Sequence, residues 1–448
     1  MSSRPGPYAS GGVRSERTDS WGTTLQTPTD RTVAPPEGVA GAAASAYPWR
    51  RVLAVFAGVS VLLTAVVAWS DRYRPDSGWA PVLQGPDWLD GWFQYDAGWY
   101  FHIASNGYFY RPGEQSSIAF FPAYPLGVRG LGQLVGDYQV AGSLLAVLCG
   151  GLAVVLFGSW VWQRLPRAAA VTAIAVLMLY PYAFFLYGAM YADSLFLLCA
   201  VGSFLLLERR WFWAAGLVGA LATAGRPVGV AVAVGLVVRT LEMLAEDRRD
   251  RAAAAAAAPG ATVPVVDRPG WRDLLGALRL VRVRHLGVLL SSAGLVAWMA
   301  YLWVEFDEPL AFVEVEGAPG WNQGVGPRTW FKVVYLGTLV KGPYAVAALL
   351  TLQALACLCA VLLVRRVWRR FGWGYAAYAV VVLAIPIIGT KDFMGTGRYV
   401  LVAFPVLAAA GDYLASSGRR WVRPLALGTC GVLLLVLTYL FGRSVAVS

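Results

Sequence analysis

One carboxylate stands alone in a strongly aromatic stretch of the sequence, WFQYDAGWYFHIASNGYFY, which covers residues 92–110. Trp92, Tyr95 and Trp99 flank this acid, Asp96. Partial removal of a carboxylate from water raises its pKa toward a value that suits a general base. The alternative is that Asp96 caps a helix that begins beside it, since aspartate is a favoured N-cap residue. The sequence leaves both interpretations open.

Further ionisable residues lie at the ends of apolar segments. Asp193 begins one such segment, where an acid can also complement the helix dipole. Arg226 lies between a glycine and a proline, and Lys391 and Arg398 share a polar segment near the end of the chain. The planar fork of a guanidinium suits a phosphate, while the alternative is pairing with lipid head groups. Three cations at span ends favour an anionic ligand.

Several chemistries are disfavoured by what the sequence lacks. Its two histidines, His102 and His285, are too few for a His-based metal site, although a divalent metal held by other ligands stays open. The sequence has no Walker loop, no GxSxG elbow and no GxGxxG motif followed by a soluble βαβ pattern. A nucleotide-driven pump and a soluble-type hydrolase are therefore disfavoured.

These residues belong to a chain with the composition of a polytopic membrane protein. Of its 448 residues 58% are hydrophobic and only 14% are charged, and the mean hydropathy is +0.56. A soluble chain of this length could not bury so much apolar surface. The formal net charge of +11 does not indicate a nucleic-acid partner, because the basic residues cluster in short groups between apolar segments, where they set membrane orientation.

The apolar segments predict an all-α polytopic fold of about eleven transmembrane helices. They lie at roughly 51–69, 138–161, 168–188, 190–207, 211–224, 226–240, 285–306, 344–364, 373–390, 399–415 and 423–441. Residues 1–47 are rich in Gly, Ser, Thr and Pro and are predicted to be a disordered cytoplasmic tail. Residues 48–448 are predicted to form a single transmembrane domain, in which residues 70–137 make a large first extracytoplasmic loop.

Arginine clusters predict the orientation of this domain in the cell membrane. Short cytoplasmic loops carry an excess of Lys and Arg, and Arg50 and Arg51 before the first span place the N-terminus in the cytoplasm. The alternation of later clusters requires residues 118–134 to be a re-entrant or surface segment. It also makes residues 241–284 a flexible cytoplasmic linker that lies on anionic lipid. The later cytoplasmic clusters lie at 164–167, 209–210, 239–284, 365–370 and 419–423.

The same topology brings the candidate residues to the extracytoplasmic face. Asp96 lies in the first outer loop, and Asp193, Arg226 and Arg398 lie at outer ends of later spans. Polar groups at membrane depth are costly unless they are paired or functional. Their convergence on one face indicates a functional site there.

Four ordered blocks of sequence carry a resemblance to a known family. They are YDAGWYFHIASNGYFY with AFFPAYPL (95–126), YPYAFFLYGAMYADSLF (180–196), ALATAGRPVG (220–229) and GRYVLVAFP (397–405). Together they resemble the GPI mannosyltransferase II (PIG-V-like) family, whose members are membrane glycosyltransferases of the multi-span GT-C architecture. Tyr95 stands where that family has Trp, and Asp193 stands where it has Glu. These departures indicate an acceptor other than GPI.

The resemblance implies transfer of a sugar, usually mannose, from a polyprenyl-phosphate donor to a lipid- or glycan-linked acceptor. Asp96 matches the acid that would deprotonate the acceptor hydroxyl, and Arg226 and Arg398 match arginines that would hold the leaving phosphate. The donor bond supplies the energy, so no cofactor is implied beyond this lipid-phosphate co-substrate. Further substrate-binding positions within the blocks are Asp193, Tyr191, His102 and Tyr124.

Two other classes of protein fit part of the pattern. A multi-span transporter or lipid flippase would explain many spans, but it predicts internal repeats and ionisable groups near the membrane midplane. The sequence shows no repeat, and its ionisable residues lie at span ends on one side. A non-catalytic membrane scaffold would leave the clustering of Asp96, Asp193, Arg226 and Arg398 unexplained. The expected partners are therefore membrane lipids, the polyprenyl-phosphate sugar and its acceptor.

Overall fold

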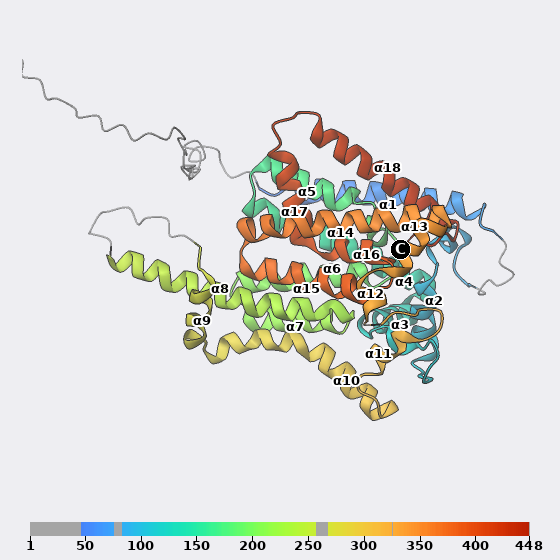
Figure 1. The fold of residues 1–448 in the computed structure, drawn as a ribbon, viewed down its shortest axis with the longest axis horizontal. Helices are drawn as coiled ribbons and strands as arrows, with labels where there is room; N and C mark the ends of the chain where they lie inside the picture. Colours follow the sequence, from blue (N-terminus) through green and yellow to red (C-terminus); the bar gives the residue numbers. More distant parts are fainter. Residues whose placement is uncertain (1–45, 76–82, 257–267, 325, 448) are drawn as a thin grey trace, which may run out of the picture. The chain divides into compact units, whose positions relative to one another are not determined.

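The computed structural model describes residues 46–75, 83–256, 268–324 and 326–447, and all regular structure in these ranges is helical (Figure 1). The expectation of an all-α fold is confirmed for this part of the chain. The predicted disordered tail lies outside the described residues, except for its last two positions.

The described helices range from a single turn to 28 residues. The α-helices are α1 (Trp49–Asp71), α2 (Asp96–Asn106), α3 (Ala123–Val135), α4 (Tyr138–Arg164), α5 (Arg167–Leu179), α6 (Asp193–Glu208), α7 (Phe212–Thr223), α8 (Val230–Ala256), α9 (Trp271–Ala277), α10 (Ala293–Phe306), α11 (Ala311–Glu314), α12 (Pro327–Trp330), α13 (Val333–Lys341), α14 (Tyr344–Phe371), α15 (Trp373–Gly389), α16 (Thr396–Val402), α17 (Phe404–Ala415) and α18 (Val422–Gly442). The 3₁₀ helices are η1 (Asp87–Trp92), η2 (Ser117–Ala119), η3 (Ala183–Leu186), η4 (Pro227–Gly229), η5 (Leu278–Leu280), η6 (Val283–Ser292) and η7 (Val315–Gly317).

Six of the described helices are long and apolar enough to cross a membrane, which indicates a multi-pass membrane protein. They are α1, α4, η4 with α8, η6 with α10, α14 and α18. The pair α16 and α17, bent by 77°, would make a seventh, and α5, α7 and α15 are shorter apolar helices. The expected count of about eleven spans is therefore not confirmed, because several expected segments form helices well short of ~20 residues.

Two of the expected connecting segments are partly helical. Residues 118–134 contain all of α3 except its last residue. This helix has 13 residues, too few to cross a bilayer, and packs on α2 and α4. Residues 241–284 begin inside α8, and the carboxylate of Glu242 there accepts hydrogen bonds from the backbone N–H groups of Trp373 at 2.9 Å and Gly374 at 3.2 Å. This first part of the segment is therefore joined to the start of α15.

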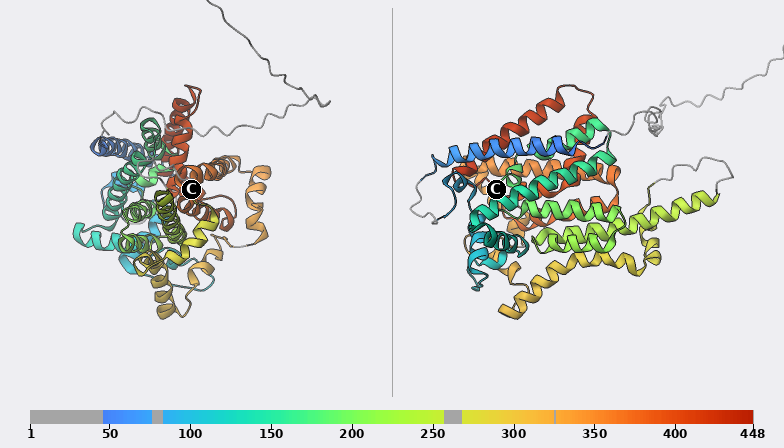
Figure 2. Two further views of the ribbon diagram at one scale, coloured as in Figure 1. Left: turned by 90° about the vertical axis from the view of Figure 1, so that its left-hand side faces the viewer. Right: turned by 180° about the vertical axis from the view of Figure 1, so that it is seen from behind.

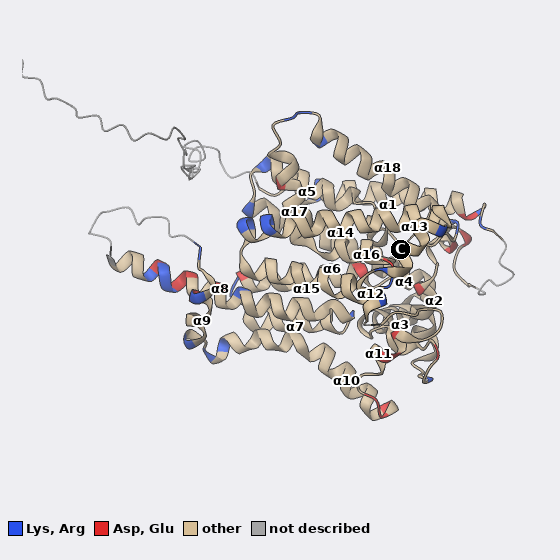
Figure 3. Ribbon diagram, in the orientation of Figure 1, with Lys and Arg blue, Asp and Glu red and all other residues tan. Residues whose placement is uncertain are grey.

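One end of the helical bundle is held by ion pairs between the predicted cytoplasmic clusters. Glu208 at the end of α6 pairs with Arg239 of α8 at 2.9 Å and with Arg164 of α4 at 3.3 Å. Asp412 of α17 pairs with Arg370 of α14 at 2.8 Å. In Figure 3, Lys and Arg residues gather at this end of the helices. Figure 2 shows α2 and α3 at the opposite end. The clusters thus gather as a positive-inside arrangement requires, while the orientation in the membrane stays a prediction.

The core around α4 and α6 fixes the segment that leads into α6. Residues 183–192, which include η3, are buried throughout. Gly150 of α4 allows this close packing, since a Cβ at that position would lie only 2.2 Å from the carbonyl oxygen of Leu186. Tyr191 and Asp193 are therefore held in position at the end of the bundle opposite the ion-pair network.

Cysteine labelling tests the predicted orientation. In a cysteine-free background, Asp87→Cys in η1 should react with a membrane-impermeant maleimide in intact cells, because the first loop is predicted to be extracytoplasmic. Ala255→Cys at the end of α8 should react only after the cells are opened. Both positions are exposed in the structure. Labelling of Ala255→Cys in intact cells would overturn the orientation.

Candidate active site

Asp96 is the first helical residue of α2, and its carboxylate accepts a hydrogen bond from Nη1 of Arg398 at 2.9 Å. Arg398 belongs to α16 and lies 302 residues further along the chain. The cap position of α2 is taken by Tyr95, which has a φ of 52° and makes no side-chain cap. The interpretation of Asp96 as an N-cap is therefore wrong, because its side chain pairs with a guanidinium from another helix.

Tyr191 holds the turn from which Asp96 projects. Its buried hydroxyl accepts a hydrogen bond from the backbone N–H of Asp96 at 3.2 Å and donates one to the carbonyl of Gln94 at 3.1 Å. A non-glycine residue with positive φ is strained, and Tyr95 is such a residue. The two hydrogen bonds of the Tyr191 hydroxyl hold the residues on either side of it. The guanidinium of Arg398 also lies over the ring of Tyr191, 5.0 Å from its centroid. Tyr191 thus positions both members of the ion pair.

A second ion pair joins Asp193 and Arg226. Asp193 begins α6 and is 1% exposed, whereas Arg226 precedes η4 and is 6% exposed. Nη1 of Arg226 donates to Oδ1 of Asp193, and its guanidinium lies 4.6 Å from the ring centroid of Tyr399. Tyr399 follows Arg398 in α16, so the two ion pairs are neighbours. Both charges of this second pair are buried, so removal of either residue would leave the other charge buried without a counter-charge.

The Asp96–Arg398 pair is the more open of the two. The side chain of Asp96 is 30% exposed and that of Arg398 is 14% exposed. Nε of Arg398 is buried without a hydrogen-bond partner among the described residues. A buried donor that lacks a partner costs about 1–3 kcal/mol, so a ligand oxygen placed here would remove a real penalty. The arrangement offers an accessible carboxylate beside a guanidinium with an unused donor.

Two predicted site residues lie apart from these pairs. His102 is half-buried on α2, more than one turn beyond Asp96, with its ring 5.4 Å from that of Phe109. Tyr124 is fully buried and donates its hydroxyl to the carbonyl of Gly142 at 2.9 Å. No hydrogen bond between described residues connects either side chain to the two ion pairs.

The structure adds residues that the sequence analysis missed. Tyr399 lies between the two arginines, and its adjacency to Arg398 in the fourth block was the available signal. Gln94 anchors the turn before α2, and its side-chain Oε1 accepts from the hydroxyl of Ser444 at 2.6 Å. Nothing in the sequence points to that contact, because it connects the first loop with the end of the chain. Across the described ranges, no three His, Cys, Asp or Glu side chains come together as a metal site would need.

Comparison with known proteins gives solved structures only. No protein-family model matches the chain, and no curated protein sequence matches it. The apo oligosaccharyltransferase of Archaeoglobus fulgidus aligns over 90% of this chain and 56% of its own, with 15% identity and a TM-score of 0.42. ArnT from Cupriavidus metallidurans, bound to undecaprenyl phosphate, aligns over 87% of this chain and 76% of its own, with 15% identity and a TM-score of 0.44.

The chain thus spans little more than half the length of that oligosaccharyltransferase. TM-scores below 0.5 describe a partial likeness in helix arrangement and carry no argument about activity. Membership of the GPI mannosyltransferase II family is not supported by these comparisons. The functional conclusion rests on the residues themselves.

The burial of the second ion pair predicts a large stability effect. Asp193→Asn should destabilise the protein by about 3–5 kcal/mol, because it leaves the Arg226 guanidinium buried without a counter-charge. The double variant Asp193→Asn/Arg226→Met should recover part of this loss. Unfolding in detergent measures both effects. Asp96→Asn is the control, with a smaller loss, since its carboxylate is partly solvated. Equal losses for Asp193→Asn and Asp96→Asn would contradict this assignment.

Proposed function

We propose that the protein is an integral-membrane glycosyltransferase of GT-C type. It transfers a sugar, with mannose as the proposed sugar, from a polyprenyl-phosphate donor to a lipid- or glycan-linked acceptor on the extracytoplasmic face. The observation that carries the proposal is the Asp96–Arg398 pair, which combines a solvent-accessible carboxylate with a guanidinium that keeps a buried, unpartnered Nε. The pair joins α2 to α16, and Figure 3 shows α2 at the end of the bundle away from the Lys and Arg residues of α8 and α9.

In this proposal Asp96 is the general base. The acceptor hydroxyl oxygen forms a bond to the anomeric carbon of the donor sugar while its proton passes to the Asp96 carboxylate. The bond from the anomeric carbon to the phosphate oxygen breaks, and its electron pair leaves with the phosphate. The hydrogen bond from Arg398 at 2.9 Å orients the carboxylate for this step.

Arg398 is proposed to bind the leaving phosphate as well. Negative charge grows on the phosphate oxygens as the bond breaks, and a guanidinium held in a water-poor site stabilises that charge. Nη1 of Arg398 is engaged with Asp96, and Nε, which has no hydrogen-bond partner among the described residues, is the donor that we assign to a phosphate oxygen. Cleavage of the donor bond drives the transfer without a nucleotide.

The remaining candidate residues are assigned positioning roles. Tyr191 fixes the turn before α2, and the buried Asp193–Arg226 pair supports Tyr399 beside Arg398. Arg226 was expected to bind phosphate directly, but its contact with Asp193 engages one side of its fork. His102, half-buried on the same helix as Asp96, remains a candidate for acceptor binding, and Tyr124 is a packing residue.

A multi-span transporter or lipid flippase is the second candidate. The 77° bend between α16 and α17 favours it, because broken helices are common in transporters. In transporters the ionisable groups at such breaks lie near the membrane midplane, whereas Arg398 lies near the start of α16 and pairs with Asp96 at the start of α2. Sugar transfer by the purified protein from polyprenyl-phosphate-mannose separates the two classes, since a transporter would move the lipid without breaking its glycosyl bond.

Asp96→Asn should lower the rate of sugar transfer by about 10²–10⁴-fold, because an amide cannot accept the proton of the acceptor hydroxyl. The measurement is transfer from the polyprenyl-phosphate donor, together with a thermal melt in detergent. Asp87→Asn is the matched control: it removes an exposed carboxylate from the same loop and should leave the rate unchanged. Near-normal turnover by a folded Asp96→Asn variant would rule out Asp96 as the base.

Arg398→Ala should raise the KM for the donor about 10–100-fold, which corresponds to the loss of a hydrogen bond to a charged group, and should also lower kcat, because the charge that Arg398 stabilises grows in the transition state. Arg398→Lys should recover little of this, because an ammonium lacks the planar fork. Arg443→Ala is the control, since Arg443 lies at the same end of the bundle and donates to the backbone carbonyl of Tyr73. An unchanged donor KM in Arg398→Ala would reject phosphate binding at this position.

A further inference from the structure

A cavity of about 610 Å³ lies between α12, α13 and the loop that leads into α16. Among its polar side chains are those of Asn322, Gln323, Arg328 and Lys391, and the described residues that line it include no acid. Two cations and two carboxamides without a carboxylate suit an oxyanion that also carries hydroxyl groups.

Both cations keep donors that a ligand can use. The ammonium of Lys391 donates one hydrogen bond to the carbonyl of Trp321 at 2.6 Å and retains two further N–H groups. Arg328 is exposed and makes no ion pair among the described residues. The side chain of Gln323 accepts a hydrogen bond from the backbone N–H of Lys391 at 2.9 Å through its oxygen, which leaves its NH₂ group for a ligand. The positive charge of the cavity is therefore not neutralised by its own lining.

The cavity adjoins the proposed reaction centre. Trp321 immediately precedes the two carboxamide residues, and its ring lies 5.6 Å from the ring of Trp99, which is less than one turn beyond Asp96. Lys391 belongs to the loop that leads into α16, the helix of Arg398. One wall of the cavity thus contacts α2, and another continues into α16.

The wall that contains Trp321 is held in place. Its ring also lies 6.0 Å from the ring of Phe120. The side chain of Gln115 donates to the carbonyl of Pro319 at 3.3 Å, and Gly320 with its φ of +99° permits the turn there. The cavity is therefore largely preformed, as is usual for ligand sites.

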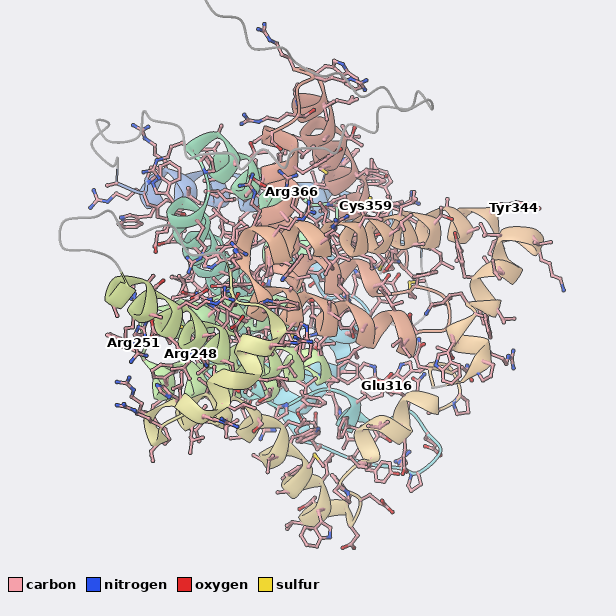
Figure 4. All side chains as sticks on the ribbon, turned by 60° about the vertical axis from the view of Figure 1, so that its left-hand side comes forward. Arg248, Arg251, Glu316, Tyr344, Cys359 and Arg366 are labelled. Carbon is pink, nitrogen blue, oxygen red and sulfur yellow. The ribbon has the colours of Figure 1, made fainter. Side chains whose placement is uncertain are left out.

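Helix α13, whose Val334 also lines the cavity, has the features of a helix at a membrane surface. None of its nine residues is buried, and Leu336 and Val340, one turn apart, are 53% and 75% exposed. It packs on α14, which is long and apolar enough to cross a membrane. Figure 4 shows Tyr344 and Arg366 near opposite ends of α14, and α13 immediately precedes the Tyr344 end. A short helix with outward apolar side chains at the end of a span fits the boundary between lipid head groups and chains.

We propose that this cavity binds the head group of the acceptor, and that the acceptor is an anionic lipid. The proposal rests on the proposed glycosyl transfer. Arg328 and Lys391 bind an oxyanion of the head group, such as a phosphate ester, while Asn322 and Gln323 bind its hydroxyl groups. The lipid chains lie against the apolar face of α13. Because the donor phosphate is assigned to Arg398, a separate cationic site fits a second anionic substrate.

The charge of the product tests the class of acceptor. Labelled mannose from polyprenyl-phosphate-mannose should pass to a lipid extract of the native membrane. The labelled product should bind to an anion-exchange resin after mild acid has cleaved the remaining donor. A labelled lipid that the resin does not retain would overturn the anionic acceptor and leave the proposed function intact. Absence of any labelled product with the wild-type protein would reject the proposed function and the acceptor assignment with it.

Arg328→Gln should raise the extract concentration needed for half-maximal rate about 10–100-fold, because a hydrogen bond between charged groups is lost. The KM for the donor should stay unchanged. Arg328→Lys keeps the charge and should retain part of the acceptor binding. Arg111→Gln is the matched control, since Arg111 is an exposed arginine of the first loop, paired with Glu114 at 3.5 Å and outside the cavity lining. A change in the donor KM alone, or no change at all, would overturn the acceptor site.

Binding in detergent solution gives a readout that needs no donor. Calorimetry should show binding of dihexanoyl phosphatidylglycerol, whose head group has an anionic phosphate and two hydroxyls. Dihexanoyl phosphatidylcholine, which lacks net charge, and glycerol 3-phosphate, which lacks chains, should each bind about 10-fold more weakly or less. Leu336→Gln should weaken binding of the anionic lipid and leave glycerol 3-phosphate unaffected, because it changes only the apolar face of α13.

Two outcomes of the binding experiment would contradict the proposal. Equal affinity for the two lipids would show that the cavity does not select an anion. Equal affinity for phosphatidylglycerol and glycerol 3-phosphate would show that it binds a free oxyanion and not a lipid. Selective lipid binding by a wild-type protein that transfers no sugar would reject the proposed function while the anionic lipid site itself remained.

Discussion

The guanidinium of Arg398 can lie inside an apolar helical bundle only because other groups replace the water that it gives up. Asp96 supplies the counter-charge at 2.9 Å, and the rings of Tyr191 and Phe185 lie over its planar face at 5.0 Å and 5.3 Å. A buried charge without such partners would cost several kcal/mol. The Asp96–Arg398 contact therefore requires the segment before α2 to fold back onto α16.

The second ion pair extends the same constraint to other segments. Asp193 and Arg226 are 33 residues apart in the sequence, whereas Asp96 and Arg398 are 302 residues apart. The Asp96–Arg398 contact therefore joins segments near the two ends of the transmembrane domain. Tyr399 lies next to both arginines. It follows Arg398 in α16, and the guanidinium of Arg226 lies over its ring. The proposed site is thus built by three helix ends and one loop, none of which holds all of the charged groups.

The sequence predicted that these charged residues lie at one end of the bundle, but not which acid pairs with which arginine. Arginine clusters and apolar runs indicate which span ends share a face of the membrane, and this brought Asp96, Asp193, Arg226 and Arg398 together. Which acid meets which arginine depends on how helices lie side by side, and hydropathy along one chain carries no such information. The expected number of spans is not confirmed, because an apolar run reveals composition and not where its helix ends: α5 and α7 are apolar but have only 13 and 12 residues.

The Asp96 cap was a local interpretation that failed because Tyr95 occupies the cap position in a strained conformation, held by a tyrosine from a distant segment. Local rules fail here where a distant side chain supplies the partner.

The pairing of the four charges also affects how the proposed site would attract ions from solution. Two carboxylates and two guanidiniums sum to no net charge, so the site has little long-range field with which to attract phosphate from the medium. Recognition must then come from short-range donors such as Nε of Arg398, which act only on a group already held beside them. Under the proposed function, a lipid carrier confined to the bilayer surface would meet this condition through its high local concentration. Such a site would discriminate by where its ligand is anchored, and its affinity would depend only weakly on salt.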